Sequence, residues 1–187
     1  MIIGIDPGKN GAIVALWKNT FYIYDIPTIK TTGLKNGQRA IIKDYDRCKI
    51  NQICHEIRSI AEYDGKPEGV WLVIEDVKDQ IFNTGNRHNY HNNQKTVYEK
   101  IRGFIILETI FEMNGFKVSY TPRANDWKRT MKLCDSRLSY SEKKEKSRLL
   151  AISLHPELAP FLTRKKDADR AEAVLLIDWA IETKGAK

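Results

Sequence analysis

The chain has 187 residues, 42% of them hydrophobic, which is enough for one sizeable core and predicts a single domain spanning residues 1–187. Its 31 lysines and arginines exceed its 24 aspartates and glutamates by 7, so a polyanionic partner is favoured over an ordinary basic surface. Three cysteines without metal-ligand spacing predict no disulfide framework, and the lack of a signal-like N-terminus or of 18 consecutive apolar residues predicts a cytoplasmic protein without a membrane segment.

The first part of the chain is predicted to form an antiparallel meander. Strand-like runs occupy residues 1–6, 11–17 and 21–26, and turn residues such as those at 18–20 separate them. Residues 27–44 are polar and contain threonine, glycine and lysine. We interpret them as a flexible loop and as a candidate DNA-facing arm.

A helix and a parallel strand are expected next. Apolar residues recur at helical spacing between residues 50 and 61, and the segment 64–67 contains the Gly and Pro that end a helix. The apolar run 70–74 is a predicted strand, which a crossover connection would place parallel to the first strand. Residues 79–94 are rich in Asn, Gln and His and too polar for a core, so we predict a loop over the functional site.

Helices are predicted for most of the second half. Apolar residues of the helix 97–113 cover more than one stripe, so one side should pack on the sheet and another should meet a second helix or a second subunit. Residues 116–121 are a predicted strand. A charged helix is expected at 141–154, where four basic residues fit a solvated face, and an apolar helix at about 168–182.

A short helix with a basic flank is predicted around Trp127 and Met131. Arg123, Lys128 and Arg129 belong to this flank and are candidate DNA-binding residues. For Trp127 itself, core packing is favoured over stacking on a base.

Four carboxylates stand where buried elements end or begin. Asp6 ends the first strand, Glu75 ends the strand 70–74, and Asp169 and Glu172 lie three residues apart at the start of the last helix, where both can face one side. Burying a carboxylate costs several kcal/mol unless it is paired or coordinates a cation. Together these residues predict a site for a divalent metal.

Each carboxylate also has an ordinary interpretation. Asp169 and Glu172 fit a capping box at a helix N-terminus. Residues 6–11 fit a turn between two strands, and Glu75 fits a strand-end side chain that faces solvent. The occurrence of all four in one chain favours the metal site.

The motifs, in chain order, are Ile5-Asp6-Pro7-Gly8, Val73-Ile74-Glu75-Asp76-Val77, Trp127-Lys128, Lys146-Ser147-Arg148 ahead of His155-Pro156, and Lys165-Lys166-Asp167-Ala168-Asp169-Arg170-Ala171-Glu172-Ala173. In this order they resemble the RuvC-type Holliday-junction resolvases, and phage-encoded members are the most similar. The resemblance covers nearly the whole chain. It implies an RNase H-like α/β fold, with a mixed central sheet flanked by helices, and a homodimer that nicks opposed strands of a four-way DNA junction.

The resemblance also implies that the four carboxylates, Asp6, Glu75, Asp169 and Glu172, bind Mg²⁺ or Mn²⁺ as the catalytic residues, with two ions at each active site. Glu172 stands where many members have Asp. Asp167 is an additional acid whose spacing would let it replace Asp169 as a ligand.

These features predict a crossover junction endodeoxyribonuclease that acts in DNA recombination and repair in a bacterial or phage-infected cell. Lys165 and Lys166 beside the site are further candidates for binding phosphate, with a solvated surface as the alternative. Two other function classes stay open. One is a non-catalytic protein of the same fold that binds branched DNA, and the less favoured one is an actin-like ATPase or kinase fragment, which usually needs two such domains.

Overall fold

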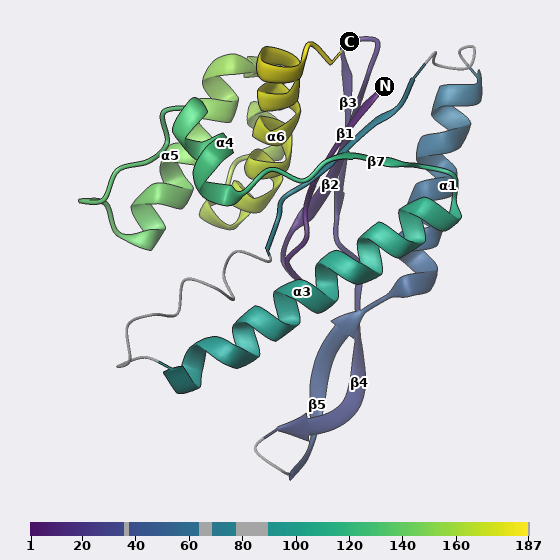
Figure 1. Cartoon of the computed structure of the whole chain (residues 1–187), viewed down its shortest axis with the longest axis vertical. Coiled ribbons are helices and arrows are strands. Elements are labelled where there is room, and N and C mark those ends of the chain that lie inside the picture. The colour runs from purple at the N-terminus through teal and green to yellow at the C-terminus, as the bar shows by residue number, and fades with distance from the viewer. Residues whose placement is uncertain (36–37, 64–68, 78–89, 187) are drawn as a thin grey trace.

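The computed structural model describes residues 1–35, 38–63, 69–77 and 90–186, with the backbone alone for residues 34, 35 and 90–96. A mixed five-stranded sheet, with strand order β3-β2-β1-β6-β7, lies between two layers of helices (Figure 1). Its strands are β1 (Ile2–Asp6), β2 (Ala12–Trp17), β3 (Thr20–Asp25), β6 (Trp71–Ile74) and β7 (Val118–Tyr120). The predicted α/β class and mixed central sheet are confirmed.

The central strand β1 fixes the directions of its neighbours. Gly4 of β1 lies opposite Val14 of the antiparallel strand β2 and opposite Val73 of the parallel strand β6. The meander and the parallel crossover predicted from the sequence are therefore confirmed. Because β1 and β6 run in the same direction, their carboxyl ends lie at the same end of the sheet, and Glu75 follows β6 there.

Helices cover both faces of this sheet (Figure 1). On one face lie α1 (Arg47–Tyr63) and α3 (Tyr90–Met113), and on the other lie α4 (Ala124–Thr130), α5 (Tyr140–Leu154) and α6 (Ala168–Lys184). Two short 3-10 segments, η1 (Pro156–Phe161) and η2 (Lys165–Asp167), connect α5 to α6. All the predicted helices are present, and their ends differ from the expected ones by a few residues.

The last helix lies directly against the central strand. A Cβ atom added to Gly4 would overlap the carbonyl oxygen of Ala173, so the backbones of β1 and α6 are in contact. Small residues on α6, such as Ala171, permit this approach. Since Asp6 follows Gly4 by two positions and Glu172 precedes Ala173, the contact brings the end of β1 beside the first turns of α6.

Residues 27–44, predicted to be a flexible loop, form a β-hairpin instead. Strand β4 (Thr28–Lys35) pairs antiparallel with β5 (Gln38–Tyr45), and the pair forms a separate two-stranded sheet that projects from the body (Figure 1). The prediction was wrong because it gave the polar composition more weight than the β-branched Thr and Ile residues. It also overlooked Asn36-Gly37, a dipeptide typical of two-residue hairpin connections.

The predicted loop 79–94 is only partly described. Residues 79–89 lie outside the described part of the chain, whereas residues 90–94 belong to α3, so that end of the prediction was wrong. A helix can continue beyond the core with polar residues on every side, because its backbone hydrogen bonds are internal.

The sides of α3 differ in exposure. Phe104, Leu107 and Phe111 are fully buried in the core shared with α1, while Ile105 is 51% exposed and Met113 is 82% exposed. Helix α1 therefore supplies the second helix expected beside α3, and contact with a second subunit stays a prediction. No helix in the described part of the chain is long and apolar enough to cross a membrane.

Candidate metal centre

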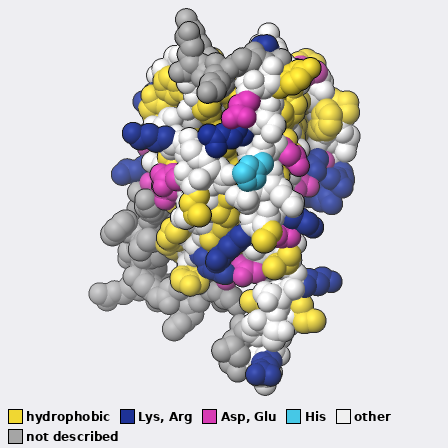
Figure 2. Space-filling model, turned by 90° about the vertical axis from the view of Figure 1, so that its right-hand side faces the viewer, with side chains coloured by type: hydrophobic (Ala, Val, Ile, Leu, Met, Phe, Trp, Pro, Cys, Tyr) yellow, Lys and Arg dark blue, Asp and Glu magenta, His cyan; other side chains and the backbone are white. Residues whose placement is uncertain are grey.

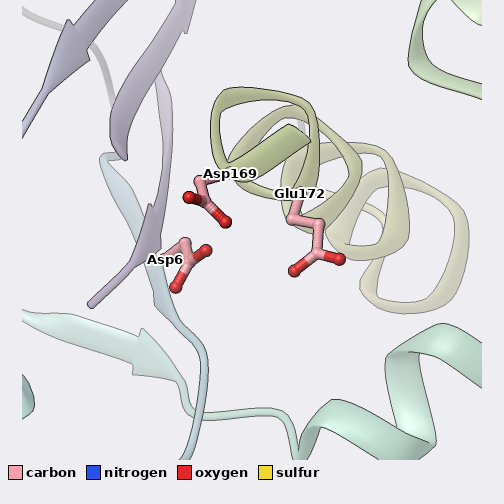
Figure 3. Close-up of side chains that lie close together, drawn as sticks. All are labelled: Asp6, Asp169 and Glu172. Carbon is pink, nitrogen blue, oxygen red and sulfur yellow. The ribbon is translucent and has the colours of Figure 1, made fainter. Parts of the chain in front are cut away.

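The end of β1, the residue after β6 and the first turns of α6 meet at one cavity of about 580 Å³. Asp6, Asp169 and Glu172 each place a carboxylate oxygen within 4.8 Å of the others (Figure 3). Glu75 lines the same cavity, outside that closest group. The structure thus brings together all four carboxylates predicted from the sequence.

The turn after β1 holds Asp6 at the cavity. The Gly8 amide donates to Asp6 Oδ1 at 3.4 Å, and the Gly11 amide donates to the Gly8 carbonyl oxygen at 2.8 Å. A Cβ atom on Gly11 would overlap the Asp6 carbonyl oxygen, so this turn needs glycine. Residues 6–11 therefore form a turn between strands, as one interpretation of the sequence had it, and the carboxylate at its start still faces the cavity.

Burial opposes the ionisation of the two strand-end carboxylates. It raises the pKa of Asp6 to about 6 and the pKa of Glu75 to about 7. Nearby negative charges raise these pKa values further: Glu172 and Asp169 raise the pKa of Asp6, and Asp6 raises the pKa of Glu75. A cation among these groups would offset both effects.

A tryptophan orients Glu75. The Trp127 indole Nε1 donates to Glu75 Oε2 at 3.3 Å, and Trp127 itself is fully buried. Core packing was therefore the correct interpretation of Trp127. The indole adds a hydrogen bond that limits the directions in which the carboxylate can turn.

Two lysine side chains contact the carboxylates. Lys144 Nζ lies 2.6 Å from Asp169 Oδ1, 2.7 Å from Glu172 Oε2 and 3.8 Å from Asp6 Oδ2. Lys128 Nζ donates to Glu172 Oε1 at 3.1 Å. Burial disfavours the charge on Lys144, but the surrounding carboxylates outweigh it and hold its pKa above the ordinary value. Lys144 thus places a positive charge of the protein itself among the carboxylates.

Glu172 has partners at both carboxylate oxygens. Its Oε1 lies 3.1 Å from Ser147 Oγ and accepts from Lys128, and its Oε2 accepts from Lys144. Although burial opposes ionisation, Lys144 and Lys128 hold the pKa of Glu172 below its ordinary value. Glu172 is therefore a buried, ionised carboxylate at neutral pH.

Asp167 is engaged elsewhere. Its Oδ2 accepts from the Arg164 backbone N–H at 2.8 Å, and its Oδ1 accepts from Arg164 Nη2 at 2.8 Å. These bonds form a box one turn before Asp169, so the capping box proposed for Asp169 and Glu172 is replaced by one that uses Asp167. Among the described residues, Asp167 belongs neither to the carboxylate cluster nor to the cavity lining, which favours Asp169 as the third ligand.

The five predicted DNA-binding residues fall into two groups. Lys128 lies in the cavity, where it pairs with Glu172, whereas Arg123, Arg129, Lys165 and Lys166 are exposed and lie outside the cavity lining. The lining contains three further lysines that the sequence did not single out as site residues, Lys9, Lys100 and Lys144.

The position of Lys144 had a weak signal in the sequence. We interpreted it as one of four basic residues on a solvated face of the helix 141–154. Ser147 and Ala151 follow it by three and seven positions, and both are buried. Small residues at this spacing mark the side of α5 that packs on α6, and Lys144 lies on that side.

The donors in this cluster suit a hard divalent cation. Carboxylate oxygens are the ligands that Mg²⁺ and Mn²⁺ prefer, and the acidic cluster of Asp6, Asp169 and Glu172 could hold such an ion. No protein-family model matches the chain, and no curated protein is significantly similar to it. The chemistry of the cavity therefore carries the functional interpretation.

Proposed function

We propose that this chain is a metal-dependent endonuclease that nicks four-way or other branched DNA junctions. The observation that carries the proposal is one cavity in which four carboxylates from three separate elements meet two lysine side chains. The carboxylates suit divalent cations, and the lysines suit the phosphate of a nucleic acid. The resemblance to RuvC-type resolvases and the sheet order, a meander followed by two parallel strands, both support an RNase H-like fold.

The residues of the cavity divide the chemistry between them. Asp6, Asp169 and Glu172 would hold one or two ions of Mg²⁺ or Mn²⁺, and Glu75, oriented by Trp127, would complete the anionic set. When bound, the metal supplies polarisation of the scissile phosphate and activation of water. In the proposed hydrolysis, water would add to phosphorus as the bond to the 3′ oxygen breaks, and a proton from that water would end on the 3′ oxygen, so no side chain has to act as a covalent nucleophile.

The two lysines are placed to bind the substrate. The side chains of Lys144 and Lys128 are 17% and 26% exposed, and both residues line the cavity while they pair with carboxylates. A phosphate entering the cavity offers both groups a second anionic partner. Removal of either lysine should weaken binding of the scissile phosphate.

The exposed basic residues extend the contact to flanking DNA. Arg123, Arg129, Lys165 and Lys166 would bind phosphates and position the duplex without reading its sequence. A homodimer would present two such cavities, which suits a four-way junction because the junction offers two equivalent strands.

The test is a cleavage assay with a labelled four-way junction and a matched linear duplex, each with Mg²⁺, Mn²⁺ or a chelator. The proposal requires nicks in the junction that depend on the metal and that exceed those in the duplex. Binding should weaken steeply as salt rises, since phosphate contacts release counterions. A protein that binds the junction but never nicks it would contradict the proposal.

One observation favours a second candidate, a non-catalytic protein that binds branched DNA. Lys144 forms ion pairs with three carboxylates, Asp6, Asp169 and Glu172, an arrangement that a purely structural cluster would also use. In that case Mg²⁺ should neither raise the melting temperature nor support cleavage, and the same assay with a thermal melt separates the two candidates.

A further inference from the structure

The two faces of the β4–β5 hairpin differ in exposure. Side chains alternate between faces along a strand, and the cross-strand register places Lys30 opposite Lys43 and Thr32 opposite Ile41. The outer part of this face, which we call the basic face, is exposed and consists of Lys30, Thr32, Arg39, Ile41 and Lys43, while Thr28 and Tyr45 at its root are half-buried and buried. Ile41 is 75% exposed. On the opposite face Thr31, Gly33, Ala40, Ile42 and Asp44 are half-buried, and only Ile29 and Gln38 among its described side chains are exposed.

The charge of the basic face is of one sign. Lys30 and Lys43 lie directly opposite each other, an arrangement that destabilises a strand pair unless an anion is present. Asp44 is the one acidic residue in the segment 28–45, and it belongs to the other face, where it accepts from Arg102 at 2.7 Å. The basic face therefore has no carboxylate of its own strands to balance it.

The root of the hairpin is joined to the rim of the cavity. Lys43 Nζ donates to Asn10 Oδ1 at 3.0 Å, and Lys9 Nζ donates to the Lys43 carbonyl oxygen at 2.7 Å. Tyr45, which follows on the same face as Lys43, lines the cavity and donates its hydroxyl to the Pro7 carbonyl oxygen at 3.0 Å. These hydrogen bonds fix the root of the basic face at the rim of the carboxylate cavity, and the rest of the face extends outward from there.

The hairpin projects at the end of the molecule where β1 ends (Figure 1). In the view of Figure 2 it forms the lower projection, with Lys or Arg side chains and hydrophobic side chains at its surface. Each of its strands has 8 residues. At about 3.4 Å per residue each strand reaches about 27 Å, which matches about eight base pairs of duplex DNA.

We propose that the basic face of the β4–β5 hairpin binds the phosphate backbone of one duplex arm of DNA as that arm leaves the cavity. This inference rests on the proposed function, because it assigns a DNA arm to the same site. Lys30, Arg39 and Lys43 contact phosphates, and Ile41 lies against sugar carbons between them. Duplex DNA is the partner because the face has the charge, the length and the connection to the cavity that a straight polyanion needs.

The test compares Lys30→Glu, Arg39→Glu and the double variant with Lys117→Glu. Lys117 is an exposed lysine just before β7, at the opposite end of the sheet from the carboxylates, and it serves as the matched control. Binding is measured by fluorescence anisotropy in chelator, which prevents cleavage, over a series of salt concentrations. Circular dichroism melts establish that each variant is folded.

We expect the double variant to bind both the four-way junction and a linear duplex about tenfold or more weakly, and to lower the salt slope by about two. Lys117→Glu should leave both quantities unchanged. Wild-type affinity and slope in the double variant would overturn this proposal, and so would an equal loss in Lys117→Glu. Equal competition by duplex RNA would overturn the assignment of DNA as the partner.

The same samples separate this inference from the proposed function. If the wild type nicks the junction and the double variant binds normally, the nuclease stands and the hairpin contact fails. If the wild type never nicks while the double variant still loses affinity, the hairpin contact stands and the nuclease fails. A wild type that binds no DNA overturns both.

Discussion

The Lys144 ammonium lies 2.7 Å from Glu172 Oε2, inside the group of carboxylates that could hold a divalent cation. A protein cation and a metal would therefore compete for the same oxygens. Lys144 offsets part of the negative charge of the cluster, and a metal bound there would have to share these oxygens with Lys144 or displace it.

Lys144→Gln should consequently lower the stability of the protein in chelator but raise its affinity for Mg²⁺. Removing one member of a largely buried ion-pair network should lower the free energy of unfolding in chelator by on the order of 3 kcal/mol. The Mg²⁺ concentration at the midpoint of thermal stabilisation should fall, since the competing charge is gone. Lys143→Gln, at the neighbouring exposed position, is the control. Melting temperatures equal to wild type in chelator would show that Lys144 does not neutralise the cluster.

Removal of single carboxylates should separate cleavage from binding. Asp6→Asn, Glu75→Gln and Glu172→Gln should each abolish nicking of a four-way junction, because each removes negative charge that holds the metal. Junction affinity should stay within a few-fold of wild type, since phosphate contacts are made by other residues. Glu112→Gln, an exposed position on α3, is the control. Wild-type nicking rates in all three variants would show that the cavity is not the active site.

Asp167 and Asp169 should differ in their effects. Asp167→Asn should keep nicking activity but lower the free energy of unfolding by about 1 kcal/mol, because it weakens the bonds with Arg164 at the start of α6. Asp169→Asn should lose nicking. Cleavage assays and urea titrations of the two variants decide the assignment, and loss of nicking in Asp167→Asn alone would reverse it.

The raised pKa values predict how stability depends on pH. Burial raises the pKa of Asp6 to about 6 and that of Glu75 to about 7, above their unfolded values near about 4, so the folded protein binds more protons in this range. Their contribution to stability is full below about pH 4 and is lost as the pH rises through 6 and 7.

In chelator, therefore, the contribution of these two groups to the free energy of unfolding should fall between about pH 4 and 7, and Glu75→Gln should make that fall smaller. Mg²⁺ should offset the fall, because it binds the ionised carboxylates. Thermal melts of both proteins across this pH range, with Mg²⁺ and with chelator, provide the measurement. If Mg²⁺ raised the melting temperature by the same amount at every pH, metal binding would not displace a proton from Glu75, and this prediction would be wrong.

We predict that the proposed homodimer forms through the exposed side of α3. Ile105→Glu and Met113→Glu should convert a dimer to a folded monomer, because both side chains are exposed in the single chain. Phe104→Glu and Phe111→Glu should unfold the protein instead, since both positions are fully buried. Sedimentation velocity at micromolar concentration gives the answer. A wild type that stays monomeric, alone and on junction DNA, would rule the dimer out.

Much of the framework could be predicted because its residues follow simple periodicities. The strands at residues 1–26 alternate with clear turns, and α1 repeats its apolar residues at helical spacing. Asp6, Glu75, Asp169 and Glu172 were identifiable because charge stood at the boundaries of apolar elements. A charged residue at the end of an apolar segment can be identified from the sequence alone.

The features that could not be predicted depend on contacts distant in sequence. Only the spacing of Lys144 from Ser147 and Ala151 separates it from Lys143 in the sequence, and the packing of α5 on α6 is what turns Lys144 into the cavity. The β4–β5 hairpin is a different case, because its β-branched residues and Asn36-Gly37 are local signals that its polar composition outweighed.

The contact between Gly4 and Ala173 has a consequence for the order in which the protein gains its chemistry. Synthesis proceeds from the N-terminus, so β1 and β6 can pair while α6 is still inside the ribosome. Until α6 emerges and its backbone seats on Gly4, the nascent chain has Asp6 and Glu75 but neither Asp169 nor Glu172. The proposed nuclease activity would therefore begin only after the last helix has docked, when the chain has left its site of translation.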